Sequence, residues 1–280
     1  MSSQPTLAAH GIVKRFGGVA AVDGVTLELH AGSVTGLIGA NGAGKSTLIN
    51  VLSGNYKPDG GSVFLEGRDV TKSSGHSRAK AGLSRTFQHP RLVPTLTCFE
   101  NVLLGAEVPR AGWRDVVAFA HLARRDRDSA ARAAAALRQL RVPEAKWSRR
   151  PNQLAPADWL WTEIARALAA DPKFLLLDEP STGFTGAENA ELIAALNRLR
   201  QRSRAAVLLV THDVTLAMRV ADTMVVMHHG ERIAAGAPDV IANDPQVISS
   251  YLGKRGHDMA LAVLAHDVEH DRTSVGAGRT

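Results

Sequence analysis

The chain has 280 residues, a formal net charge of +6 and a single cysteine, Cys98. This length suits one large α/β domain with an inserted subdomain, which can bury a sizeable core without disulfides. A lone cysteine excludes an internal disulfide, and the N-terminus lacks the pattern of a secretion signal, so we expect a reducing compartment. No stretch approaches the roughly 18 uncharged apolar residues that a membrane-spanning helix needs.

The basic balance predicts acidic partners, among which nucleotides, nucleic acids and lipid headgroups all qualify. Arginines crowd the alanine-rich stretch from Arg110 to Arg150. This stretch is either a solvated helical surface or a docking surface, and the sequence leaves both interpretations open.

The first predicted elements are strands. From Ala8 to Leu29, and again from Ser62 to Glu66, apolar and polar side chains alternate. This period of two predicts half-buried antiparallel strands. Between them an apolar run, Val34–Ile38, leads through a glycine-rich segment into a helical run, Thr47–Leu52. We therefore expect an antiparallel β-flank beside a parallel α/β core.

The glycine-rich segment has the pattern of a phosphate-binding P-loop in its strand-loop-helix setting. Glycines let successive backbone N–H groups curl around an anion, and the following helix presents its positive end to the same phosphates. Lys45 would reach the β- and γ-phosphates of ATP, and the Ser46 hydroxyl would ligate Mg²⁺. A glycine-rich turn that binds nothing is the alternative. The predicted nucleotide-binding residues are Gly39, Asn41, Gly42, Ala43, Gly44, Lys45, Ser46 and Thr47.

The chain then becomes helical. From Thr97 to about Arg150, alanine, arginine and leucine prevail and there is no strand signal, which predicts an inserted helical subdomain. Gln88 lies just before this insert. By itself it is a weak signal, and it gains meaning only from its place in the order of motifs.

Two later apolar runs predict buried parallel strands, because each follows a helical segment. The run Phe174–Leu177 ends in Asp178 and Glu179, and the run Ala206–Val210 precedes His212. The carboxyl ends of parallel strands share one edge, where ligands bind in such folds. We expect Asp178 to ligate Mg²⁺, Glu179 to accept a proton from the attacking water, and His212 to contact the γ-phosphate.

The last predicted element is a hairpin within Asp222–Ala235, with its turn at His229 and Gly230. Beyond Gly253 the chain becomes polar and mixed. We predict that residues 254–280 form a loosely ordered tail.

The order and spacing of these motifs resemble the ATP-binding subunits of ABC transporters over residues 7–253, and within them the branched-chain amino acid transport group. The supporting stretches are Lys14–Gly18, Ser84–Gln88, Phe99–Gly105, Asn243–Ile248 and Tyr251–Gly253. The resemblance implies an α/β P-loop NTPase fold, with an ABC ATP-binding domain over residues 5–253. Its parts would be an antiparallel β-subdomain with the first part of the core (5–96), an inserted α-helical subdomain (97–165) and the rest of the core (166–253).

The resemblance also assigns roles to two further residues. Phe16 would stack on adenine through its aromatic face, the alternative being a core aromatic beside a turn. Gln88 would sense Mg²⁺ and the attacking water while it couples the site to a transmembrane partner.

The chain departs from the family at the signature segment, defined here as Leu154–Asp158 and usually Leu-Ser-Gly-Gly-Gln. In the family this segment closes over the nucleotide that the other subunit holds. Ala155 removes a hydroxyl whose hydrogen bond to a charged phosphate is worth about 1.5–3 kcal/mol. Pro156 deletes a backbone N–H at a helix start. Ala157 adds a Cβ where glycine allows close approach, and Asp158 brings a negative charge towards a polyanion.

Three further positions also differ from the family. Trp159 and Trp161 stand where polar or basic residues are usual, and we expect them to cover a partner or a core surface. Thr185 replaces the usual Asp or Asn and lacks the carboxylate or amide that would communicate across the dimer.

The substitutions in the signature segment affect only the nucleotide that the partner subunit holds. The nucleotide held by this chain is instead served by the P-loop, Gln88, Asp178, Glu179 and His212. The sequence therefore predicts an asymmetric heterodimer with a second ABC ATPase subunit that carries an intact signature.

The resemblance implies an ATPase that uses ATP and Mg²⁺ to drive an importer for branched-chain amino acids or related small polar solutes. Its partners would be transmembrane permease subunits and, indirectly, a solute-binding protein. The chain would then lie peripherally at the cytoplasmic face of the cell membrane. One alternative is a nucleotide-binding regulatory or structural subunit that hydrolyses little ATP. The other, an ABC-type protein that acts on nucleic acid, rests only on the basic balance, so no nucleic acid is expected as a partner.

Overall fold

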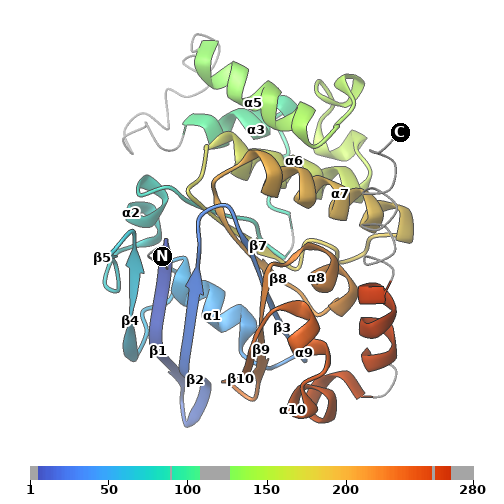
Figure 1. The fold of residues 1–280 in the computed structure, drawn as a ribbon. Helices are drawn as coiled ribbons and strands as arrows, with labels where there is room; N and C mark the ends of the chain where they lie inside the picture. Colours follow the sequence, from blue (N-terminus) through green and yellow to red (C-terminus); the bar gives the residue numbers. More distant parts are fainter. Residues whose placement is uncertain (1–5, 89, 108–126, 254–255, 266–280) are drawn as a thin grey trace, which may run out of the picture.

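The computed structural model describes residues 6–88, 90–107, 127–253 and 256–265, which form two sheets and a helical layer (Figure 1). The predicted fold class, an α/β P-loop fold with an antiparallel flank and a helical insert, is confirmed. Much of the arginine-rich stretch, residues 110–126, lies outside the described residues, so neither interpretation of that stretch is tested.

The antiparallel flank is a four-stranded sheet in the order β2-β1-β4-β5. Its alternating side chains bury one face, as the period of two predicts. The strands are β1 (Leu7–Phe16), β2 (Val19–Leu29), β4 (Gly60–Leu65) and β5 (Arg68–Asp69).

The central sheet has six strands in the order β10-β9-β3-β8-β7-β6, and only β10 runs antiparallel to its neighbour. The β9–β10 pair is the hairpin expected around His229 and Gly230. The bounds are β3 (Val34–Gly39), β6 (Leu83–Arg85), β7 (Phe174–Asp178), β8 (Ala206–Val210), β9 (Thr223–His228) and β10 (Glu231–Gly236).

The central strands are buried on both faces, which explains their uninterrupted apolar sequences. Along β7, Leu176 points to the core that holds helix α1 (Lys45–Leu52) and the β-flank, whereas Leu175 and Leu177 point to the core beneath the helical layer. Helix α1 therefore lies between the two sheets, with the P-loop at its start (Figure 1). A shorter helix, α2 (Gly75–Lys80), begins at the Ser74 cap.

The helical layer covers the other face of the central sheet (Figure 1). It consists of α3 (Cys98–Glu107), α5 (Arg127–Gln139), α6 (Pro156–Ala169) and α7 (Gly186–Arg202), with 3₁₀ turns at Glu144–Lys146 and Pro151–Gln153. The boundary predicted at residue 165 falls inside α6, which continues without a break to Ala169. The helical subdomain is therefore joined to the core by a continuous helix.

The chain ends in a third cluster around α8 (Val214–Val220) and α9 (Pro238–Ala242). After α10 (Pro245–Val247) and a π-helical turn, Ile248–Leu252, residues 256–265 form another helix. Ala260 and Val263 on it are buried against this cluster. This part of the predicted tail is therefore helical and packs against a core, whereas residues 254–255 and 266–280 lie outside the described residues.

Among the described residues, no helix combines the length and the apolar character needed to span a bilayer.

Candidate nucleotide site

The P-loop connects the end of β3 to the start of α1, as its sequence predicts. Gly39 and Gly44 have φ values of +155° and +99°, which side-chain-bearing residues rarely adopt. A Cβ on Gly39 would collide with the Met227 carbonyl oxygen, and one on Gly44 with the Ala21 carbonyl oxygen. Gly44 is also the N-cap of α1 and supplies no side-chain cap, so the first N–H groups of the helix are left for an anion.

The Lys45 ammonium lies inside the curl of this loop. Its Nζ atom donates to the Gly39 carbonyl at 2.7 Å and to the Ala40 carbonyl at 3.1 Å. Burial lowers the pKa of Lys45, while the charges of Glu179 and Asp178 act to raise it. A largely desolvated cation beside a row of backbone donors is suited to binding a polyphosphate. Ser46 is exposed and Thr47 half-buried on the first turn of α1.

The remaining candidate residues meet this loop at one edge of the sheet. Asp178 ends β7 opposite Val210, which ends β8, and Val210 pairs with Leu37 of β3. Residues predicted from three distant segments are thus brought to the carboxyl ends of adjacent parallel strands.

Glu179 and His212 form a direct contact at this edge. Oε2 of Glu179 lies 2.6 Å from Nδ1 of His212 and accepts a longer hydrogen bond, 3.4 Å, from the His212 backbone N–H. Glu179 has a φ of +50°, an uncommon value for a side-chain-bearing residue, and such strain persists only where the surroundings impose it. The Glu179 side chain is 8% exposed and that of His212 is 56% exposed. A buried carboxylate that holds an exposed imidazole can accept a proton from water and orient the ring.

Asp178 is held by a residue that the sequence reasoning did not single out. Arg85, on the adjacent strand β6, donates from Nη2 to Oδ2 of Asp178 at 2.9 Å. Its Nη1 donates to Oδ1 of Asn50 at 2.6 Å and to the Ser53 hydroxyl at 2.9 Å. Arg85 therefore ties the acidic strand to α1, the helix that carries Lys45 and Ser46. The pairing of β6 with β7 was the missing signal, because it makes Arg85 a neighbour of that strand's end.

A divalent cation fits the donor set at this position. Oδ1 of Asp178 is buried and has no hydrogen-bond partner, although the other carboxylate oxygen is fully engaged. An unpartnered buried carboxylate oxygen is costly unless it has a ligand, and carboxylate and hydroxyl oxygens are the donors that Mg²⁺ prefers.

The structure places Gln88 and Phe16 less firmly in the site. The preceding Thr86 hydroxyl accepts from the Asp178 N–H at 3.1 Å, which holds the segment before Gln88 against β7. Gln88 itself is exposed, and no hydrogen bond among the described residues joins it to Asp178 or Glu179. The Phe16 ring is 46% exposed and contacts the Tyr56 ring edge-on, so Phe16 is not a core aromatic.

Comparison with known proteins decides the family. The profile described as ABC transporter matches residues 22–182, more than half of the chain. The chain belongs to this family. A second profile, branched-chain amino acid ATP-binding cassette transporter, matches residues 231–257.

Curated relatives of this ABC protein match almost end to end. The high-affinity branched-chain amino acid transport ATP-binding protein LivG of Salmonella typhimurium is 37% identical over 254 residues, covering 90% of this chain and 99% of LivG. The corresponding BraF protein of Pseudomonas aeruginosa is also 37% identical, over 257 residues, with the same coverage. The chain is therefore the ATP-binding subunit of an ABC transporter and an ATPase.

Solved ABC cassettes share the fold. The ADP conformation of MJ1267 superposes with a TM-score of 0.79 at 30% identity, covering 90% of this chain and 100% of that one. A nucleotide-free ATP-binding cassette from an ABC transporter gives a TM-score of 0.78, with the same identity and coverage.

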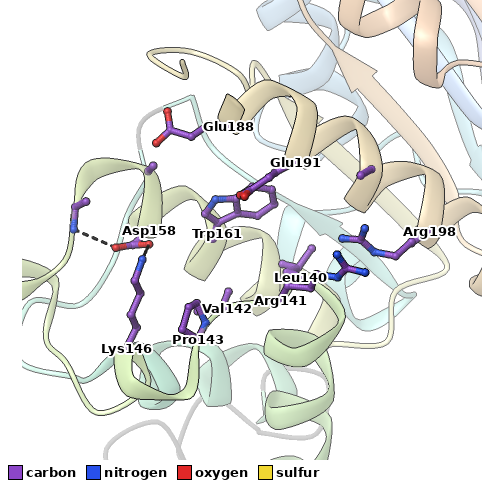
Figure 2. A pocket seen from close by; sticks show the side chains of 13 residues that line it. Leu140, Arg141, Val142, Pro143, Lys146, Asp158, Trp161, Glu188, Glu191 and Arg198 are labelled. Carbon is purple, nitrogen blue, oxygen red and sulfur yellow. Dashed lines mark hydrogen bonds and ion pairs between the residues drawn. The ribbon is translucent and has the colours of Figure 1, made fainter. Parts of the chain in front are cut away.

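The signature segment of this ABC ATPase lies at the start of α6. Pro156 occupies the first helical position and has no N–H, and the Asp158 N–H already donates to the Ala155 carbonyl at 2.9 Å. Oδ2 of Asp158 accepts from the Ala155 N–H at 3.2 Å, and Oδ1 lies 2.6 Å from the Lys146 ammonium (Figure 2). The Asp158 charge is thus balanced within the chain, and the repulsion expected from it is correspondingly reduced.

Of the two tryptophans after the signature segment, Trp161 is buried within the chain, whereas Trp159 is only half-buried. Trp161 is 7% exposed, packs with its ring tilted against that of Phe184, and lines a cavity of about 350 Å³ beside Asp158 (Figure 2). The Trp159 indole donates to the Pro151 carbonyl at 2.8 Å.

Thr185 caps α7: it donates from its hydroxyl and its N–H to the Glu188 carboxylate at 2.8 and 2.7 Å.

Proposed function

We propose that this chain is the ATP-hydrolysing subunit of an importer for branched-chain amino acids or related small polar solutes. The observation that carries the proposal is the Glu179–His212 contact of 2.6 Å at the strand edge that also holds the P-loop. The names of the 37%-identical relatives and the profile over residues 231–257 supply the solute class. The chain would bind permease subunits at the cytoplasmic face of the membrane, with a solute-binding protein acting through them.

Within this proposal Ser46 and Asp178 hold Mg²⁺, and Gln88 contacts it when a nucleotide is bound. The cation neutralises charge on the phosphates. The chain's own groups do the rest: the P-loop N–H groups and Lys45 position the nucleotide, Phe16 stacks on adenine, and Glu179 receives a proton from the attacking water.

We further propose that the chain works in an asymmetric heterodimer. The first turn of α6 has lost the Pro156 donor and has committed the Asp158 N–H to its own backbone. A helix start with few free donors is a poor site for a γ-phosphate. The nucleotide site at this chain's P-loop would therefore be completed by a second ABC ATPase subunit with an intact signature.

The test compares ATP hydrolysis by the purified chain with hydrolysis by the assembled complex, with and without candidate amino acids. We expect weak activity from the chain alone and solute-stimulated activity from the complex. A variant with Ala155→Ser, Pro156→Gly, Ala157→Gly and Asp158→Gln should gain ATPase activity without a partner subunit. In a pair of such chains, the restored signature segment of one chain can close over the nucleotide that the P-loop of the other chain holds. Substantial cooperative hydrolysis by the unmodified chain alone would refute the asymmetry.

A nucleotide-binding regulatory subunit that hydrolyses little ATP is the second candidate. The poor donor set at the start of α6 favours it, whereas the intact Glu179–His212 contact counts against it. Glu179→Gln separates the two candidates, because it should abolish turnover only if this chain's own site hydrolyses ATP.

A further inference from the structure

Tyr251 reaches from the π-helical turn Ile248–Leu252 back to the candidate nucleotide site. Its hydroxyl donates to the His212 backbone carbonyl at 3.0 Å. The backbone of Gly39, the first residue of the P-loop, lies beside the same phenol oxygen. One side chain from the π-helical turn therefore touches both the loop that holds phosphate and the loop that carries the histidine.

The phenol is a dependable donor in this position. Burial raises the pKa of Tyr251 to about 12, and the nearby Glu179 and Asp213 carboxylates act in the same direction, despite the opposing effect of the Gly39 backbone. The hydroxyl therefore keeps its proton at neutral pH. The proton is therefore available for the bond to the His212 carbonyl.

The turn that carries Tyr251 is anchored at both ends. Asp244 caps α10 by accepting from the N–H groups of Gln246 and Val247 at 2.8 and 3.1 Å. Val247 and Leu252 are buried in the cluster that also contains Ile38 of β3. The phenol is therefore presented to the site by a packed element.

The histidine makes few hydrogen bonds of its own, although the preceding residue, Thr211, donates from its N–H to the Leu37 carbonyl of β3 at 3.1 Å. The His212 ring is 56% exposed and is bonded to Glu179, and among the described residues its backbone N–H makes only the 3.4 Å bond to the same carboxylate. Tyr251 supplies the hydrogen bond on the carbonyl side. We propose that Tyr251 is a positioning residue, which fixes the His212 backbone relative to the P-loop so that the imidazole meets the γ-phosphate. This inference rests on the proposed function, because it assumes that His212 contacts the nucleotide.

The test is Tyr251→Phe in the complete complex, since it keeps the ring and removes only the hydroxyl. Loss of a neutral hydrogen bond predicts a fall in kcat of about three- to tenfold, with KM for ATP changed less than about twofold. Ser249→Ala is the matched control: it deletes, from the same turn, a hydroxyl that bonds the Gln246 carbonyl at 3.1 Å, and kcat should stay as in the wild type.

A double-mutant cycle distinguishes positioning of His212 from a general structural effect. In a His212→Ala complex, Tyr251→Phe should lower kcat no further. If the two substitutions multiply, or if Tyr251→Phe alone retains the wild-type kcat, the inference is overturned. Absence of hydrolysis by the wild-type complex would instead overturn the proposed function, and binding of a fluorescent ATP analogue to the variant chain confirms that the site is folded.

Discussion

The P-loop, Asp178, Glu179 and His212 form the part of the candidate nucleotide site that this chain itself supplies, here called the half-site. This half-site differs sharply from the signature segment. In the half-site, Asp178 ends a buried strand and its Oδ1 atom has no hydrogen-bond partner among the described residues, so it is free for a ligand. In the signature segment the charge of Asp158 is already balanced by Lys146 and by the Ala155 N–H.

Under the proposed function, the difference means that this chain is equipped to hydrolyse its own nucleotide and poorly equipped to complete the site of another subunit. A ligand site needs unsatisfied groups held in place, which is costly in the absence of ligand. In the half-site, these groups are held in place by packed strands and by the hydrogen bonds of Arg85 to Asp178, Asn50 and Ser53. In the signature segment, the Asp158 carboxylate and the N–H groups of Ala155 and Asp158 already have partners within the chain, so under the proposed function fewer donors are left for a phosphate.

The largest expected effect is on the half-site. Glu179→Gln preserves the shape of the side chain and removes its capacity to take a proton, so ATP hydrolysis by the complete complex should fall about 10²–10⁴-fold. Binding of ATP should persist, because Lys45 and the P-loop are untouched. Glu231→Gln, at an exposed position on β10, is the control and should leave the rate unchanged. Retained turnover in the Glu179 variant would move the hydrolytic site to the other subunit.

The next effect is on stability. The side chains of Arg85 and Asp178 are only 9% and 5% exposed. Arg85→Met would leave a buried carboxylate without its partner, which costs about 3–5 kcal/mol of unfolding free energy. Denaturant unfolding measures it, and adding Asp178→Asn in the same chain should recover part of the loss.

Arg200→Met is the matched control, because Arg200 pairs with Asp222 at 2.8 Å while both side chains are about two-fifths exposed. An exposed pair contributes roughly 0–1 kcal/mol. Equal losses in the two arginine variants would mean that burial does not distinguish these pairs.

Much of this comparison could be predicted from the sequence, because the half-site depends on local patterns. A P-loop between an apolar run and a helix, and carboxylates directly after an apolar run, carry their own structural context. The supporting contacts could not be predicted, because they join distant segments. Arg85 meets Asp178 only through the pairing of β6 with β7, and Lys146 meets Asp158 only through the turn before α6. The burial of residues 256–265 likewise depends on a cluster assembled from other elements.

A smaller effect is expected at the predicted adenine position. Phe16→Ala should raise KM for ATP about three- to tenfold with little change in kcat, because a stacked aromatic pair is worth about 0.5–1.5 kcal/mol and acts equally in the ground and transition states. Val19→Ala, 69% exposed on the partner strand opposite Phe16, is the control. A Phe16 variant with unchanged KM would show that adenine is held elsewhere.

The smallest effect is expected in the signature segment. Asp158→Asn removes the charge that Lys146 neutralises but keeps an oxygen that can accept from the Ala155 N–H, so the loss of stability should be about 1 kcal/mol or less. Thermal unfolding would show a decrease of about 2–4 °C for each kcal/mol in a chain of this size. Glu144→Gln, which breaks an ion pair whose side chains are 64% and 70% exposed, should show almost none. If Asp158→Asn also raises hydrolysis by the chain alone, then the Asp158 charge, and not the missing Pro156 donor, is what keeps this segment from the partner's phosphate.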